Sequence, residues 1–371
     1  MSNTFLTSTD VSRDAGLILQ DNLLVGLMGN RSVETKFNGK VGSTVYVKVP
    51  PIATASELAV GGTTNVDDIT ESRVPVVVEK HIYIKKEVTS EELTYSLDDF
   101  NALVQYPVID ALVLKAETYF LEKLCGGFAQ NLAGTAGNQP STLAHIVAAE
   151  KKIFDNKANE NQLVSIISST AHASLLQATV FTSSDYGPNR PSALVSNSLG
   201  KMAGMDFFRS PYSGTYTRGD ITGSVTASGT AAAATCSLAS LSSSTGTIYA
   251  GTRFVVAGDA TIYTVMENAT IASNAVAALS IYPVLATSPS TAAVTFETAF
   301  KHNVVFNPVA FALAMVTPPA VGAGVSVASS KGISIRVSSN FDQSYLKNIW
   351  TWDFYIGARV VQPKYGCILC G

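Results

Sequence analysis

The sequence predicts an α+β fold, and three observations predict it. Apolar and polar residues alternate over 44–49 and again over 81–85, which indicates half-buried strands. Apolar residues from Leu112 to Phe128 recur at helical spacing, which indicates one long amphipathic helix. Only four residues between Ile221 and Thr298 are charged, and short strand-like runs follow one another closely there. The chain therefore combines helices, sheets and a separate all-β module.

The first element is an N-terminal arm over residues 1–40 with one predicted helix. Its amphipathic stretch consists of Leu17, Ile18, Leu23, Leu24 and Leu27, and Gly29-Asn30 reads as the stop signal.

Residues 41–88 predict an extended loop built as a hairpin. The strand Thr44–Val49 leads out and the run from Val74 to Lys86 leads back. The segment Pro51–Arg73 between them carries four acidic residues against Arg73 alone. A two-stranded hairpin is marginally stable by itself in water. We therefore expect this arm to be ordered on a second copy of the chain.

Helices dominate the next part of the chain. Thr89-x-x-Glu92 and Ser96-x-x-Asp99 are typical of capping boxes, and Pro107 suits the first turn of the long helix, which ends near Gln130. A second helix opens at Pro140-Ser141, and a buried strand over Leu163–Ile167 precedes a short helix near Ala171–Gln177. This alternation indicates a compact mixed domain.

The all-β module is expected over residues 219–298, inserted into that domain. Its strand candidates are Phe254–Val256, Ile262–Val265, Ala278–Tyr282 and Ala293–Phe296. The mixed pattern of apolar, polar and charged residues seen before the module resumes over Lys301–Val316. Strand-like runs follow at Ile333–Val337 and Ile349–Ile356.

Composition limits the function classes. The chain has 371 residues, 46% of them hydrophobic and only 14% charged, with a net charge of −3. A low content of charged residues suits packed sheets and extensive subunit contacts. The slightly negative net charge does not indicate binding to nucleic acid or to an anionic membrane. Neither a signal peptide nor a membrane-spanning run is expected.

The search for chemistry predicts no enzyme and no catalytic, cofactor-binding or metal site. P-loop, dinucleotide and hydrolase fingerprints are absent, since Gly39-Lys40 and Gly200-Lys201 lack the spacing of a P-loop. The pairs Glu91-Glu92 and Asp98-Asp99 fit helix starts. Cys367-x-x-Cys370 has no companion ligands at zinc spacing, so semi-buried thiols in a reducing cytosol are expected. The other candidate ligands are scattered: Cys125, Cys236, His81, His145, His172 and His302.

The aromatic run Trp350–Tyr355, beside Lys347 and Arg359, has two readings. One is a platform that stacks nucleic-acid bases. The other is a buried strand, which fits better because the aromatic side chains alternate between the two faces of the run.

Taken in order, these elements resemble the major capsid protein of tailed bacteriophages, in the group whose subunit carries an inserted β-barrel domain. Four stretches carry the resemblance: the strand Gly42–Val49 with its loop and return Val74–Glu87, the lead Val88–Phe100 into the Pro107 helix, the strand and turn Gly204–Pro211, and the closing strands Ile349–Pro363.

The resemblance implies the tailed-phage capsid (Johnson) fold, with these domains: the arm, 1–40; the extended loop, 41–88; a peripheral domain with the long helix, 89–138; an axial domain, 139–218 and 299–330; the inserted barrel, 219–298; and closing strands, 331–371. It implies pentamers and hexamers in an icosahedral shell around double-stranded DNA, which is held non-specifically on the inner face. Scaffolding and portal proteins are implied partners, with the virion, and the host cytoplasm during assembly, as locations and no membrane contact.

Two alternatives stay open besides an enzyme. An encapsulin nanocompartment shares the fold but holds a cargo enzyme, and the β insertion argues against it. A phage tail or adhesion protein would suit the Ser/Thr/Ala-rich module, although the long capped helix argues against that class.

Overall fold

The computed structural model describes residues 8–34, 44–50, 55, 57, 71–89, 101–128, 131–135, 138–158, 161–178, 199–212, 219–259, 261–297, 303–322, 324–330 and 333–371. The chain divides into two compact units. Unit 1 comprises residues 1–117 and 311–362, and unit 2 comprises residues 118–310 and 363–371.

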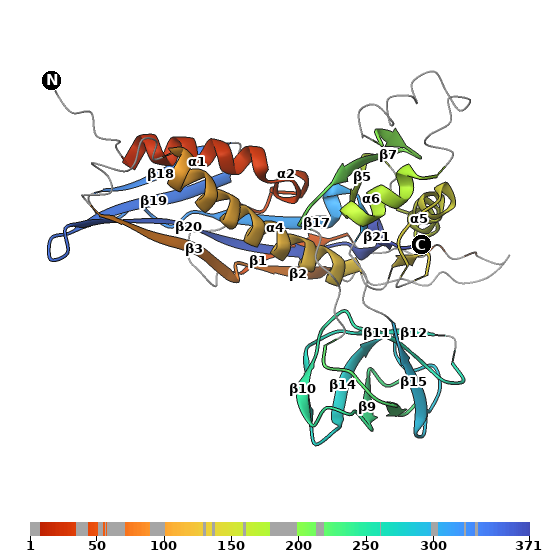
Figure 1. Ribbon diagram of the computed structural model, residues 1–371. Helices are drawn as coiled ribbons and strands as arrows, with labels where there is room; N and C mark the ends of the chain where they lie inside the picture. The colour runs from red at the N-terminus through yellow and green to blue at the C-terminus, as the bar shows by residue number, and fades with distance from the viewer. Residues whose placement is uncertain are drawn as a thin grey trace, which may run out of the picture. The chain divides into compact units, whose positions relative to one another are not determined.

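Unit 1 is built on a long antiparallel sheet with helices on one face (Figure 1). Its helices are α1 (Ser8–Asn22), α2 (Val25–Met28), a π-helical turn (Asn101–Gln105) and the first part of α4 (Tyr106–Phe128), and its strands are β1 (Thr44–Val49), β2 (Ser72–Val77), β3 (Lys80–Thr89), β17 (Phe311–Val316), β18 (Val325–Ser330), β19 (Ile333–Asp342) and β20 (Lys347–Val360).

The strand β20 is the centre of this sheet, which we call the main sheet. It pairs with β3 along one side, and with β19 and then β17 along the other. β18 pairs with β19. Trp350, Trp352 and Phe354 alternate along β20 and are buried, whereas Tyr355, which follows Phe354, faces the opposite side and is half-buried. The buried-strand reading of this aromatic run is therefore confirmed.

Helix α1 packs on β18 and β19, and the apolar residues that face these strands differ from the predicted ones. Val11, Ala15 and Leu19 are fully buried, four residues apart, whereas Leu17 is 47% exposed. The helix begins at Ser8, so the core-facing side is set by residues upstream of the stretch singled out in the sequence. The expected single helix is two, because α2 follows a break at Leu23-Leu24.

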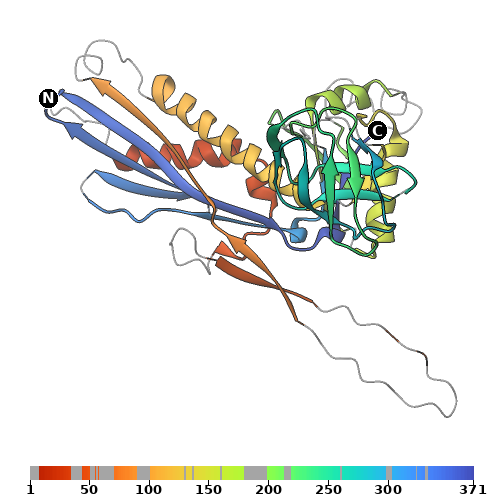
Figure 2. The same cartoon turned by 90° about the horizontal axis from the view of Figure 1, so that it is seen from below.

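The return run of the predicted hairpin is also two strands. Among the described strands, β1 pairs with β2, while β3, after a break at Val78-Glu79, pairs with β20. The crossing is possible because Gly357 of β20 has no side chain: a Cβ there would lie 2.2 Å from the carbonyl oxygen of Val77. Figure 2 shows β1 and β2 as a two-stranded ribbon leaving the main sheet.

Within its described residues, unit 2 contains a second sheet, the last part of α4, two further helices and a closed barrel (Figure 1). The first group of its elements is β4 (Leu132–Ala133), α5 (Leu143–Asp155), β5 (Leu163–Ile167), α6 (Ser169–Leu176), β6 (Lys201–Met202), β7 (Met205–Arg209), β16 (Val304–Phe306) and β21 (Gly366–Leu369), with the sheet order β4-β21-β16-β5-β7-β6. The helices α5 and α6 supply Ile146, Ile153 and Leu175 to its core.

The barrel is the predicted inserted all-β module. Its strands run in the order β11-β12-β14-β9-β8-β15, with a two-stranded β10-β13 sheet beside them. Their bounds are β8 (Thr226–Ser228), β9 (Thr235–Ala239), β10 (Thr245–Ile248), β11 (Arg253–Val256), β12 (Ile262–Val265), β13 (Ala269–Ala272), β14 (Val276–Tyr282) and β15 (Ala292–Phe296). A hydrophobic core that includes Phe254, Tyr263 and Leu279 fills it.

The second expected axial segment, residues 299–330, is split between the units. β16 lies in the sheet of unit 2, whereas β17 and β18 belong to the main sheet of unit 1. The chain enters unit 1 at Phe311, directly after a short 3₁₀ turn over Pro308–Ala310.

Candidate functional site

A cluster of apolar side chains in unit 1 packs against β1 and β2 where these strands leave the main sheet. We call this cluster the arm base. Its apolar side chains are Val33, Val76, Val78, Ala312, Ala314 and Val361, with the inner faces of β1 and β2 packed against them. Along β1 the valines at 45, 47 and 49 face this cluster, whereas Tyr46 is 60% exposed. The period-two alternation predicted from the sequence thus places the valines on one face of the β1–β2 ribbon, and this face packs on unit 1.

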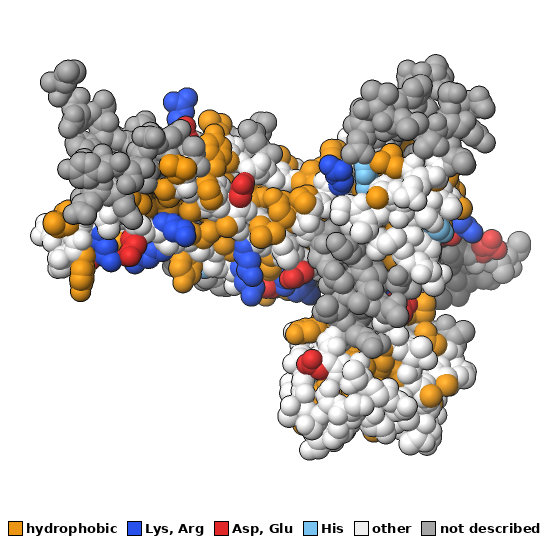
Figure 3. Space-filling view, viewed as in Figure 1, with side chains coloured by type: hydrophobic (Ala, Val, Ile, Leu, Met, Phe, Trp, Pro, Cys, Tyr) orange, Lys and Arg blue, Asp and Glu red, His pale blue; other side chains and the backbone are white. Residues whose placement is uncertain are grey.

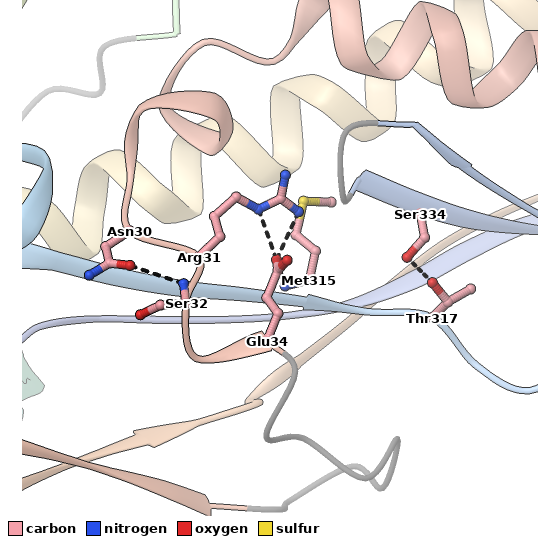
Figure 4. Close-up of polar contacts among 7 residues, drawn as sticks. All are labelled: Asn30, Arg31, Ser32, Glu34, Met315, Thr317 and Ser334. Atoms are coloured by element: carbon pink, nitrogen blue, oxygen red, sulfur yellow. Dashed lines mark hydrogen bonds and ion pairs between the residues drawn. The ribbon is translucent and has the colours of Figure 1, made fainter.

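Polar contacts fix residues 30–34, which precede β1 in the sequence (Figure 4). The backbone N–H of Asn30 donates to the carbonyl oxygen of Phe311 over 2.8 Å, and that of Leu313 donates to the carbonyl oxygen of Asn30 over 3.1 Å. Residues 30–34 therefore follow the edge of β17.

A carboxylate anchors the same segment. Glu34 accepts a hydrogen bond from the backbone N–H of Met315 over 2.9 Å and from Arg31 Nη2 over 2.8 Å. Burial raises the pKa of Glu34, and the bond from Arg31 opposes that rise. Thr317 and Ser334 make a separate side-chain hydrogen bond in unit 1 (Figure 4).

A buried carboxylate on α4 holds the start of α2. Glu117, fully buried, accepts hydrogen bonds from the backbone N–H groups of Leu24, Val25 and Gly26 at 2.8, 2.9 and 3.4 Å. These donors have no partner within a helix, and the helix dipole favours a negative charge beside them. Burial raises the pKa of Glu117 to about 7, with the three backbone bonds acting in the opposite direction.

The face of the main sheet opposite α1 carries a second ionic cluster. Asp353, 2% exposed at its side chain, receives Arg336 Nε at 2.9 Å and Nη2 at 2.6 Å, and contacts His81 Nε2 at 2.8 Å. His81 also stacks against Tyr355, with 4.4 Å between ring centroids. The three strands β3, β20 and β19 each contribute one member, so the cluster fixes their register.

The histidines and cysteines are not arranged as a catalytic or metal site within the described residues. His81 belongs to the cluster just described, His145 lies near the start of α5, His172 is buried on α6, and His302 lies outside the described residues. No group of three or more potential metal ligands occurs in the parts of the chain that the structure describes.

All four cysteines are free and buried. Burial raises the pKa of Cys367 and of Cys370 to about 12, and the Cys367 thiol donates to the carbonyl oxygen of Ala149 over 3.7 Å. Protonated, buried thiols are poor nucleophiles and poor metal ligands. The pairs Glu91-Glu92 and Asp98-Asp99 lie outside the described residues, as does most of the arm segment Pro51–Arg73.

Among the described residues of unit 2, a cavity of about 410 Å³ is lined in part by Lys152, Arg253 and Tyr282. Arg253 lies 3.6 Å from Glu297, which balances its charge. Among the described helices, none is both long and apolar enough to cross a membrane.

Comparison with known proteins assigns the fold. Residues 87–231 match the model of a family described as phage capsid protein. No curated protein matches the chain. A protein of Mycobacterium phage Che8 superposes with a TM-score of 0.55 at 13% identity, covering 93% of this chain and 90% of its own.

Two capsid structures superpose to a similar extent. The capsid of cyanophage P-SCSP1u gives a TM-score of 0.50 at 10% identity, covering 92% of this chain and 86% of its own. The mature capsid of bacteriophage PhiM1 gives a TM-score of 0.50 at 11% identity, covering 93% of this chain and 86% of its own. The chain therefore has the fold of tailed-phage capsid proteins, as the sequence resemblance implied, and its residues 87–231 carry the sequence pattern of the phage capsid family.

Proposed function

We propose that this chain is the major capsid protein of a tailed phage, which assembles into pentamers and hexamers of an icosahedral head around double-stranded DNA. The observation that carries the proposal is the arm base: apolar contacts hold β1 and β2, the two ends of the predicted arm, on a fold that phage capsid proteins share. A fixed base aims the arm at a neighbouring copy, and ring-forming heterologous contacts need such a reach.

The two units take separate roles in this proposal. Unit 1, with the main sheet and the arm, corresponds to the peripheral domain and extended loop. Unit 2 corresponds to the axial domain with its inserted barrel. The division follows the contacts within each unit, including the distinct cores around the arm base and inside the barrel.

Partners follow from the same role. The chain would associate with its own copies, with a scaffolding protein during assembly in the host cytoplasm, and with a portal protein in the virion. Packaged DNA would lie against the inner face without sequence-specific contacts, in keeping with a net charge of −3 that offers no strong overall attraction to phosphates.

Electron microscopy of the purified chain tests the proposal. Uniform closed shells are expected from the full chain, and deletion of Ala55–Ile69 should leave a folded subunit that no longer forms them. Normal shells from the deletion variant would contradict the role of the arm. Shells that enclose a protein cargo and no DNA in infected cells would favour the encapsulin alternative, and absence of any shell would contradict the proposal itself.

A further inference from the structure

The two edges of the main sheet differ in chemistry. β3, on one edge, carries Lys80, Lys85, Lys86 and Glu87, and Figure 3 shows basic side chains over this strand. β18, on the other edge, reads Val-Ser-Val-Ala-Ser-Ser and contains no charge and no proline. Charged side chains on an edge strand discourage pairing with another chain, whereas an uncharged edge invites it. β18 is therefore the edge that is open to strand addition.

The register shows which backbone groups of β18 point outward. The backbone N–H of Ser339 donates to the carbonyl oxygen of Gly324 over 2.9 Å, so this opposed pair is a hydrogen-bonded one. Hydrogen-bonded and non-hydrogen-bonded pairs alternate along an antiparallel ladder. Ser326 and Ala328 therefore direct their N–H and C=O groups toward β19. Val325, Val327 and Ser329 direct theirs away from the sheet.

The outward side of β18 is accessible, although Arg336 of β19 lies opposite Val327. Val327 is 42% exposed, and Ser329 is exposed beside it. On the other face, α1 lies close to β18: a Cβ at Gly16 would be 3.4 Å from the Cβ of Ala328. The next residue of α1, Leu17, is 47% exposed. Among the described strands, β19 is the one that pairs with β18.

We propose that β18 pairs antiparallel with β18 of a second copy of the chain, about a two-fold axis at Val327. This inference rests on the proposed function, because a shell of repeated subunits supplies the second copy. In this register Val327 faces its counterpart, and Val325 faces Ser329 of the partner. Every outward N–H and C=O group of the three residues then finds an acceptor or donor, and the two main sheets become continuous.

Self-pairing suits β18 and not β3. Like charges placed opposite each other destabilise a strand pair, and β3 brings three lysines against one glutamate. The β18 strand brings no charge at all, so a second copy meets it without repulsion. An isologous contact of this kind uses the same surface on both subunits and therefore closes at two copies.

A charge-pair experiment tests the register. The double variant Val325→Lys/Ser329→Lys places lysine opposite lysine across the axis, and at least tenfold fewer shells are expected at low salt. The variant Val325→Lys/Ser329→Glu places lysine opposite glutamate and should assemble like the native chain. Both keep the same length and add charges at the same positions, so equal assembly of the two variants would overturn the inference.

A cross-linking experiment separates this inference from the proposed function. Val327→Cys should give a disulfide-linked dimer on oxidation, whereas Tyr83→Cys, at a side chain 63% exposed on the β3 edge, should not. The native buried cysteines provide the background control. Native shells without linked dimers would overturn the pairing and leave the capsid role intact. Linked dimers from a chain that forms no shells would support the pairing and contradict the capsid role.

Discussion

The carboxylate of Glu117 lies 2.9 Å from the backbone N–H of Val25 and so joins the long helix α4 to the start of α2. The contact is buried, and it binds a segment more than ninety residues away in the sequence. It holds α2, and the chain that follows α2 leads to the arm base. The contact also makes the anchoring of this segment depend on pH.

Replacement of Glu117 by Gln should change how stability varies with pH. The pKa of Glu117 in the folded chain is about 7, above its ordinary 4.5, so the folded chain retains a proton that the unfolded chain loses. The stability of the folded chain that depends on protonated Glu117 is fully present below pH 4.5. It is lost as the pH rises through 7. The native chain should therefore lose roughly 2–3 kcal/mol more than Glu117→Gln between pH 4.5 and 8. Urea unfolding of the unassembled subunit at both pH values measures this, and parallel pH profiles would contradict it.

Asp353→Asn should destabilise unit 1. The substitution leaves Arg336 without the carboxylate that receives two of its hydrogen bonds, and removal of one partner from a buried pair costs about 3 kcal/mol. The matched control is Glu87→Gln, because Glu87 pairs with Lys347 on the same sheet but is 64% exposed at its side chain. The control should cost less than about 1 kcal/mol. Equal losses in thermal unfolding would mean that Asp353 is not the register-fixing residue.

Gly357→Ala should disrupt the crossing between β2 and β3. The added Cβ would lie 2.2 Å from a backbone oxygen of Val77, which cannot move aside without displacing the arm. Gly126→Ala on α4 is the control, since nothing lies within 4 Å of a Cβ there and alanine favours a helix by about 1 kcal/mol. The melting temperature should fall for the first variant and rise or stay constant for the second. A Gly357→Ala chain that melts and assembles normally would refute the crossing argument.

Residues 219–298 should fold when expressed alone. The strands close into a barrel around their own core, so few of their apolar side chains depend on the rest of the chain. A cooperative melt with β-type circular dichroism is expected, and Phe254→Ala, which empties a fully buried site, should lower its stability by about 3–5 kcal/mol. A disordered spectrum at low temperature would show that the module needs its host domain.

The sequence by itself determined the elements whose signal is local. The alternation over 44–49, the helical spacing from Leu112 to Phe128 and the loss of charge after Ile221 each reflect which side of one element is buried, and the structure has a strand, a helix and a barrel there.

Only the tertiary structure decided the partners of these elements. Pairing depends on residues far apart in the chain: β3 leaves the hairpin because Gly357 lets the backbone cross, and the stripe of α1 is set by β18 and β19. The buried acceptor Glu117 has no sequence signal, because a glutamate on an amphipathic helix is ordinarily exposed. Its role arises only where three backbone N–H groups of a distant segment meet it.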